Sequence, residues 1–349
     1  MKINIITSGF VFNNVRSLLF PIIKFENFFR SRGIEFNLLK KINTNCDILF
    51  IESNFIGKRY IQDFSNLKDD FKRLRKNIKK IIYFDTSDST SILHPKLINY
   101  VDVYCKGQIL KNLENYKYKY YGNRIFTDYA HRNFGITDKN KTFSEKLNKD
   151  NLKKIKVYWN AGLMNHSFLG KIYSHFYSSL PMQKLLNYPK PKTYIKKNQL
   201  FFAMTTDYTR NTIAWQRKYA LKKISLKPNL KRVSIFKYYK KLSESKVCLS
   251  PFGWGEINYR DFESFTYATL LVKPDMNHLK TWPQLYNSKN MVSYNWSCND
   301  LKNKINQIEQ NEKHFSFIAT SAQKNYLNFL NSKDLELSLL KRILNIINF

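Results

Sequence analysis

The chain has 349 residues, of which 43% are hydrophobic and 16% aromatic, so it can form folded cores and is not a disordered protein. Its formal net charge of +33 favours acidic partners such as nucleotides, anionic lipid surfaces or an acidic polymer. An A/T-rich genome explains much of this charge equally well, because Lys, Asn, Ile, Phe and Tyr are all plentiful. No zinc-finger spacing, RNA-binding aromatic signature or arginine-rich run is present, so we do not expect sequence-specific nucleic-acid recognition.

The cysteines and histidines show no pattern typical of disulfides or metal ligands. The six histidines have no ligand spacing, so a structural zinc ion is not expected. No apolar run is long enough for a membrane span. We therefore expect a cytoplasmic protein, with the inner face of the membrane as a candidate peripheral location. Four cysteines lie far apart without a C-x-x-C pair, which predicts reduced thiols: Cys46, Cys105, Cys248 and Cys298.

The first half of the chain alternates strand-like and helical segments. A buried strand at residues 2–7 is followed by a helix over about residues 16–32, which Gly33 ends. A basic helix with an apolar stripe is predicted over residues 65–80. This alternation is typical of a Rossmann-like sheet with crossover helices. The further strand-like runs are residues 35–39, 46–53, 79–87, 100–106, 124–128 and 155–161.

A proline-containing stretch at residues 187–197 is the expected domain boundary, because prolines favour extended linkers over packed elements. We therefore predict an α/β fold with two Rossmann-like domains, residues 1–186 and residues 187–349, that face each other across a cleft. The last helices are candidates to pack back on the first domain. Beyond the boundary, strands are predicted at residues 199–204, 246–252, 269–274 and 291–295, and helices at 209–224 and 234–245.

The stretch SPFGWGEINYRDFES, residues 250–264, combines two of the chain's ten glycines with several charged side chains. We interpret Gly253, Trp254 and Gly255 as a turn between a strand and a helix that begins at Glu256. The first amide groups of a helix lack partners, its dipole favours anions, and glycines let the backbone approach a ligand closely. The turn is therefore a candidate phosphate site.

Two side chains of this predicted helix suit other parts of a nucleotide. Arg260 can add a charge-assisted contact to a phosphate, and the carboxylate of Glu263 can accept both hydroxyl protons of a ribose diol. The competing interpretation is structural. Glu256, Arg260 and Glu263 stand at spacings that also produce ordinary ion pairs on a helix surface.

The segment from Val247 to Tyr286 resembles the donor-site segment of GT-B-type glycosyltransferases, in particular bacterial ones distantly similar to exostosins. In that family a strand ending in Ser-Pro-x-Gly leads into a Glu-bearing helix, and an apolar strand ending near proline follows. The resemblance implies a GT-B-type fold in which residues 187–349 bind a nucleotide sugar and residues 1–186 bind the acceptor. It also implies that the acceptor is a glycan or a lipid-linked molecule in surface-glycan assembly.

By the same resemblance, Glu263 would hold the ribose diol of the donor. The chain departs from the family in two places. Thr269 stands where glycine is usual, and Glu256 and Glu263 are one residue closer together than is common in retaining members. The stereochemical outcome is therefore left open. The other residues expected around the diphosphate or the donor sugar are Gly253, Trp254, Gly255, Glu256 and Asp275.

Charge on a leaving diphosphate must be offset, and the chain has no D-x-D triplet to hold a bridging metal. We therefore expect metal-independent chemistry, with no cofactor apart from the nucleotide sugar as co-substrate. Arg210, at the start of a predicted helix, is the candidate phosphate cation. Lys273 and Lys218 are the alternatives.

An acceptor hydroxyl needs a general base if the reaction inverts configuration. Asp85 and Asp88 are the candidates, since they come just past the carboxyl end of a strand, although an Asx-turn or a helix cap also explains either residue. His131 and His166 are alternative bases. The sequence thus predicts a glycosyltransferase. The competing prediction is a basic Rossmann-type module that binds nucleic acid or an acidic polymer without catalysis.

Overall fold

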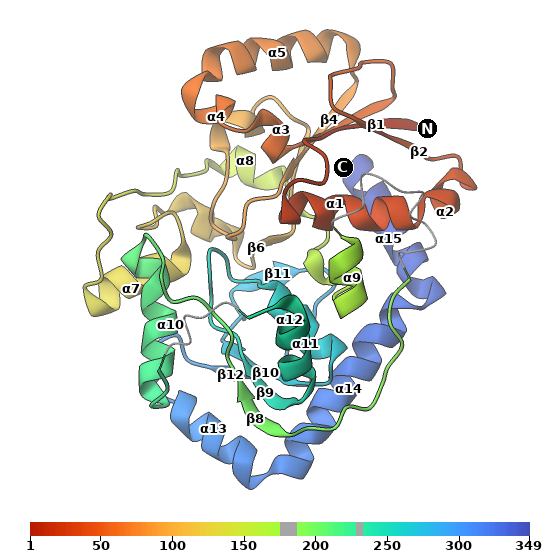
Figure 1. The fold of residues 1–349 in the computed structure, drawn as a ribbon. Helices are drawn as coiled ribbons and strands as arrows, with labels where there is room; N and C mark the ends of the chain where they lie inside the picture. The colour runs from red at the N-terminus through yellow and green to blue at the C-terminus, as the bar shows by residue number, and fades with distance from the viewer. Residues whose placement is uncertain (175–186, 228–232) are drawn as a thin grey trace.

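A computed structural model describes residues 1–174, 187–227 and 233–349, and its centre consists of two parallel β-sheets (Figure 1). The first sheet has six strands in the order β2-β1-β3-β4-β5-β7, and all neighbouring strands are parallel. Buried apolar runs form the strands of this sheet, as predicted, except for the edge strand β2, which is partly exposed. The strands are β1 (Lys2–Ile6), β2 (Glu35–Leu39), β3 (Ile48–Glu52), β4 (Lys80–Asp85), β5 (Val103–Lys106) and β7 (Ile155–Val157).

Helices connect and cover the strands of the first sheet. The predicted basic helix is α5 (Phe64–Asn77), which buries Leu67, Phe71 and Leu74 and exposes its charged face. The strand predicted at residues 124–128 is wrong, because these residues cap and begin α7 (Ile125–Phe134). A run of five mixed residues does not distinguish a short strand from the first turns of a helix. The other helices are α1 (Asn13–Lys24), α2 (Glu26–Arg30), α3 (Ser53–Ile56), α4 (Arg59–Gln62), α6 (Pro95–Ile98), α8 (Lys149–Lys153) and α9 (Phe168–Tyr173), with 3-10 turns at Leu113–Lys117 and Ala161–Leu163.

The second sheet has four parallel strands in the order β12-β10-β9-β8. The predicted α/β fold with two parallel sheets is therefore confirmed. Its strands are β8 (Asn198–Phe201), β9 (Ser245–Leu249), β10 (Leu270–Pro274) and β12 (Met291–Tyr294). Its helices are α10 (Asn211–Lys223), α11 (Ile235–Ser243), α12 (Tyr259–Thr266), α13 (Leu301–Gln310) and α14 (Glu312–Leu330).

A short ladder and the last helix are among the features that link the two halves of the chain, the residues before and after the expected division. β6 (Gln108–Leu110) pairs antiparallel with β11 (Leu279–Thr281). The last helix, α15 (Lys333–Ile347), follows α14 and lies beside the first sheet (Figure 1), where Arg342 Nη1 donates a hydrogen bond to the Val157 carbonyl at 3.0 Å. The division that we expect between residues 186 and 187 falls between β7 and β8 and stays a prediction. Residue 186 itself lies outside the described residues.

The carboxyl ends of the two sheets meet. The loop after β4 contacts the turn after β9, where the Thr90 amide donates to Glu256 Oε2 at 3.0 Å. In open parallel sheets, ligands bind beyond the carboxyl ends of the strands. We therefore expect a ligand site at the contact between the halves. In the three described ranges, no helix combines the length and hydropathy that crossing a bilayer requires.

Candidate functional site

The glycine turn does not lead directly into a helix. Helix α12 begins at Tyr259, so the predicted start at Glu256 is wrong by three residues. Asn258 is the N-cap, and the Asp261 side chain accepts from the Asn258 amide at 3.0 Å in a capping box. A capping box is a strong start signal and satisfies amide groups that a helix otherwise leaves free. The head of α12 is therefore partly occupied by its own side chains.

Protein atoms pack closely against both glycines. A Cβ atom on Gly255 would lie 2.1 Å from the Asp88 carbonyl oxygen, and one on Gly253 would lie 2.6 Å from Arg217 Nη2. Trp254 lies near Arg124, whose guanidinium carbon is 5.4 Å from the indole ring. Only glycine leaves room for the groups that approach the backbone here. These groups are Asp88 and Arg217, and not the phosphate that we expected. A phosphate can reach Gly255 only if the first half of the chain moves away, whereas the groups against Gly253 belong to the second half itself.

Glu256 joins the two halves instead of forming a helix-surface pair with Arg260. Its carboxylate is fully buried and accepts hydrogen bonds from Thr90 N at 3.0 Å and Ser89 Oγ at 3.3 Å. His278 Nε2 lies 3.9 Å from Glu256 Oε1. Burial opposes ionisation, but the contacts with His278 and Thr90 hold the pKa of Glu256 below its usual value.

Arg260 is half-buried, with its guanidinium atoms Nε and Nη1 enclosed, and it lies beside a buried arginine, Arg217, which the sequence analysis did not select. One Arg260 nitrogen donates to the Ala203 carbonyl, while Nε and Nη1 have no hydrogen-bond partner in the described part of the chain. Arg217 donates to the carbonyl oxygens of Phe252 at 2.8 Å and Thr205 at 3.0 Å. Burial and the nearby Arg260 charge lower the pKa of Arg217 to about 10. A buried cation beside a guanidinium group whose enclosed donors are unused is typical of an anion-binding site.

Arg217 had a signal in the sequence. Ile213, Ala220 and Leu221 are all buried on one face of α10, and Arg217 stands on that same face, four residues after Ile213. An arginine in an apolar helical stripe is unusual, because the charge costs free energy to bury unless it has a ligand or partner. The position of Arg217 in this apolar stripe, and not a sequence motif, is the signal by which it could have been predicted as a site residue.

Glu263 is buried and accepts two hydroxyl protons, from Tyr238 at 2.6 Å and Tyr239 at 2.9 Å. Burial raises the pKa of Glu263 above its usual value. The carboxylate lines a cavity of about 10 Å³ together with Asn13 and Lys171, so the cavity reaches the first half of the chain. The two tyrosine hydroxyls make the contacts that we expected a ribose diol to make. The role of Glu263 in ribose binding stays a prediction.

Arg210 has a protein carboxylate where we expected a phosphate. Its Nε and Nη2 atoms donate to Asp138 Oδ2 at 2.9 and 2.6 Å, and Thr212 also donates to Asp138. The pair ties the start of α10 to the segment after α7. A phosphate contact from Arg210 would require this ion pair to break. Of the alternative cations, Lys273 is fully buried against Asp261, and Lys218 is exposed on α10.

The two candidate bases differ in access. Asp85 is fully buried beside its register partner Lys106 and accepts from Tyr104 Oη at 2.5 Å. Burial opposes its ionisation, but the charges of Lys106 and His94 lower the pKa of Asp85 to about 2. Asp85 is therefore not placed to take a proton from a substrate. Asp88 is exposed and lines a cavity between the halves, where Asn14 Nδ2 donates to it at 2.5 Å.

The remaining predicted residues have local partners. Asp275 is half-buried and forms an Asx-turn at the end of β10, where it accepts from the Asn277 amide at 2.9 Å. His166 is buried with Nε2 2.7 Å from the Ala161 carbonyl, and burial lowers the pKa of His166 to about 4. His131 stacks on Tyr121. None of these contacts identifies a ligand.

Glu52 is a buried acid that the sequence analysis missed. It ends β3, accepts from Ser8 Oγ at 2.9 Å and from the Phe55 amide at 2.8 Å, and has no cationic partner within the described ranges. Burial raises the pKa of Glu52 from 4.5 to about 7. It lies beside β1, where the strand order of the first sheet reverses, and such points commonly hold ligands.

The raised pKa of Glu52 predicts a pH-dependent stability. Between pH 4.5 and 7 the folded chain keeps a proton that the unfolded chain has lost, so the free energy of unfolding should fall as pH rises, by on the order of 3 kcal/mol. Urea unfolding of the natural protein and of Glu52→Gln across this window measures the effect. The variant should show a flatter dependence, and equal slopes would contradict the assignment.

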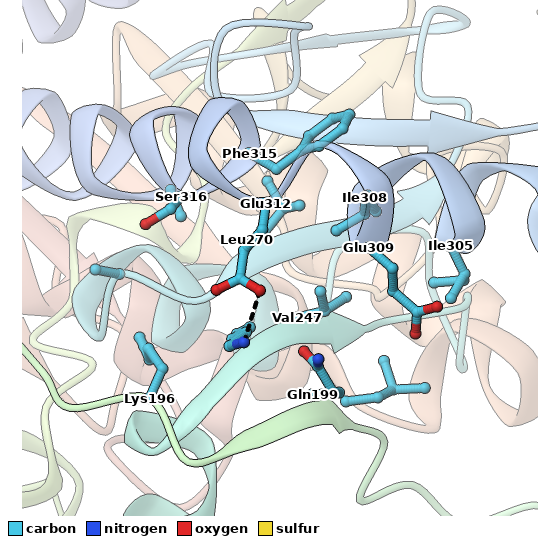
Figure 2. A pocket seen from close by; sticks show the side chains of 14 residues that line it. Lys196, Gln199, Val247, Leu270, Ile305, Ile308, Glu309, Glu312, Phe315 and Ser316 are labelled. Carbon is cyan, nitrogen blue, oxygen red and sulfur yellow. Dashed lines mark hydrogen bonds and ion pairs between the residues drawn. The ribbon is translucent and has the colours of Figure 1, made fainter.

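The cavities show how closed the contact between the halves is. The cavity beside Asp88 holds about 50 Å³, whereas small-molecule pockets usually have about 300–1,000 Å³. A separate pocket of about 80 Å³ lies beside α13 and α14, and no predicted site residue lines it (Figure 2). Its walls are mainly apolar, and Lys246 forms an ion pair with Glu312 at 2.8 Å at its rim. In the described ranges, no three His, Cys, Asp or Glu side chains gather in a way that could hold a metal ion.

No protein-family model and no curated protein sequence matches this chain. Among the solved structures that are similar to it are three with low sequence identities and TM-scores below 0.5. Anabaena HepE in complex with UDP-glucose is 9% identical with a TM-score of 0.47, and all of both chains is covered. A Rickettsia africae glycosyltransferase is 10% identical with a TM-score of 0.44, covering 97% of this chain and 98% of that one. Staphylococcus aureus MnaA with UDP is 10% identical with a TM-score of 0.41, covering 100% and 98%. These values are too low for us to infer a shared function from them.

Proposed function

We propose that this protein is a glycosyltransferase that moves a sugar from a nucleotide-diphosphate sugar to a glycan or a lipid-linked acceptor, without a metal ion. One observation carries the proposal. Arg260, at the carboxyl end of the second sheet, has two enclosed guanidinium nitrogens without a hydrogen-bond partner in the described ranges, and Arg217 lies beside it. Arg260 also lies inside the segment that resembles the donor site of GT-B-type enzymes.

A diphosphate would supply what this cluster lacks. Its oxygens would accept from the free nitrogens of Arg260, and its charge would offset two adjacent cations that now repel each other. As the sugar–phosphate bond breaks, negative charge grows on the leaving diphosphate. Fixed guanidinium donors at that position stabilise the transition state more than the ground state.

Glu263 and Asp88 would complete the site from opposite sides. The Glu263 carboxylate already accepts two hydroxyl protons, from Tyr238 and Tyr239, and a ribose diol would replace them. Asp88 is the accessible acid of the first half and packs against Gly255. It would act as general base for the acceptor hydroxyl if the configuration inverts. Because the halves are in contact, substrates would enter only after they separate, and closure would then exclude water.

A thermal-shift screen against UDP-, GDP-, CMP- and ADP-sugars, followed by a transfer assay in EDTA, tests this function. The matching donor should raise the melting temperature, since a ligand at a hundred times its dissociation constant stabilises by about 2.7 kcal/mol. Glu263→Gln should lose most of the shift. Glu309→Gln is the matched control, because Glu309 lies in the pocket beside α13 and α14.

The competing function is a basic module that binds nucleic acid or an acidic polymer. It predicts tight binding to generic nucleic acid that falls steeply with salt, together with no effect of any nucleotide sugar. If that pattern appears, and the EDTA-treated protein transfers no sugar, the glycosyltransferase proposal is wrong.

A further inference from the structure

Exposed apolar side chains gather beside the cavity that Glu263 lines. Leu169 of α9 is 54% exposed, and Ile235 and Phe236 at the start of α11 are 39% and 64% exposed. The two helices touch, because the rings of Phe168 and Phe236 lie 6.1 Å apart. We call Leu169, Ile235 and Phe236 the apolar rim.

The beginning of α1 extends the rim from the first half of the chain. Asn13 lines the same cavity as Lys171 and Glu263. Phe12, the residue before it, is 48% exposed, and Val11 is also exposed. The apolar side chains thus come from both halves and stand around the opening through which substrates would enter.

Lysines stand on both helices of this rim, and the acid nearest to them in the described ranges is the buried Glu263. α9 carries Lys171, and α11 carries Lys237, Lys240 and Lys241 at exposed positions, while neither helix contains Asp or Glu. Glu244, the residue that caps α11, has a partner of its own because it pairs with Lys197. Apolar tips with positive charge beside them match the chemistry of an anionic lipid surface, where the tips enter the headgroup layer and the lysines approach phosphate.

We propose that the apolar rim and its lysines dock this protein on an anionic membrane surface, with the opening at Glu263 facing the lipid. A nucleic acid fits this surface less well. Of the five exposed apolar side chains around the cavity, Val11, Leu169 and Ile235 cannot stack on bases, which leaves Phe12 and Phe236. The docking surface rests on the proposed function only in that it would present a lipid-linked acceptor to the site.

Vesicle co-sedimentation tests the proposal with the full chain. The protein should bind vesicles of phosphatidylglycerol and phosphatidylcholine, and it should bind pure phosphatidylcholine only weakly. Leu169→Ser with Phe236→Ser should lower the partition coefficient more than tenfold. Lys237→Glu with Lys240→Glu should lower it by at least about fivefold per lysine. Phe317→Ser is the matched control, since Phe317 is 69% exposed on α14, and it should bind as the natural protein does.

Three outcomes would overturn the docking surface: no binding to anionic vesicles, equal losses in the rim variant and the Phe317 control, or rim variants that lose binding to RNA but not to vesicles. The nucleotide-sugar thermal shift of the rim variants separates this proposal from the proposed function. Normal vesicle binding without any thermal shift would reject only the glycosyltransferase. A normal shift without vesicle binding would reject only the docking surface.

Discussion

Replacing Arg260 by methionine should stabilise the unliganded protein and weaken binding of the nucleotide diphosphate. The substitution removes two enclosed nitrogens without partners, gives up one hydrogen bond to the Ala203 carbonyl, and keeps an apolar side chain of similar length. We expect the free energy of unfolding in urea to rise by about 1–3 kcal/mol. Affinity for the donor should fall about a hundredfold, because a buried charge-assisted contact contributes roughly 2–5 kcal/mol. Gains of stability at the expense of function are characteristic of binding sites.

The same substitution at Arg217 is the control, and it should have the opposite effect on stability. Arg217 already donates to the carbonyl oxygens of Phe252 and Thr205, so methionine would leave buried acceptors unpaired at a cost of about 1–3 kcal/mol. If Arg260→Met also destabilises the chain and leaves donor binding intact, Arg260 is a structural residue. The anion site would then have to lie elsewhere.

Replacing Lys273 by methionine should destabilise the protein more than replacing Arg217 does. Lys273 Nζ lies 3.0 Å from Asp261 Oδ2, and both side chains are fully buried. Without the lysine, Asp261 would be an uncompensated charge between α12 and β10. Breaking a buried ion pair in this way costs about 3–5 kcal/mol, which urea unfolding would detect directly.

Two further variants check the cause of that loss. Adding Asp261→Asn to Lys273→Met removes the unpaired charge and should recover part of the stability, even though Asp261 also accepts from Ser250 and Tyr286. Lys246→Met breaks the partly exposed pair with Glu312 and should cost less than about 1 kcal/mol. Similar losses for the buried and the exposed lysine would show that the ion pair is not the reason.

The central strands of both sheets were predictable because each is a short buried apolar run that turn residues bound, as in β3 and β10. The start of α12 was predicted wrongly although its signal is in the sequence. Asn258 followed by Asp261 three residues later is a capping-box pattern. The prediction instead placed the helix start directly after the two glycines. Arg217 likewise stands in a visible apolar stripe.

The partners of the predicted site residues could not be predicted. Asp138 meets Arg210 from 72 residues away, and Thr90 meets Glu256 from 166 residues away. Such contacts depend on how the two halves pack, and local patterns of hydrophobicity, caps and turns carry no information on that packing. The sequence therefore indicated which residues are charged and which are glycines. It did not indicate that other protein groups contact these residues in this arrangement.

The ladder between β6 and β11 has a consequence for how the halves separate. Gln108, Ile109 and Leu110 pair with Thr281, Lys280 and Leu279, so this short ladder joins the halves at their centre, and α15 joins them again at the first sheet. Sliding the halves apart would break both connections. A rotation about an axis through the ladder would keep its hydrogen bonds while Asp88 moves off Gly255, so the ladder is the expected hinge of the opening.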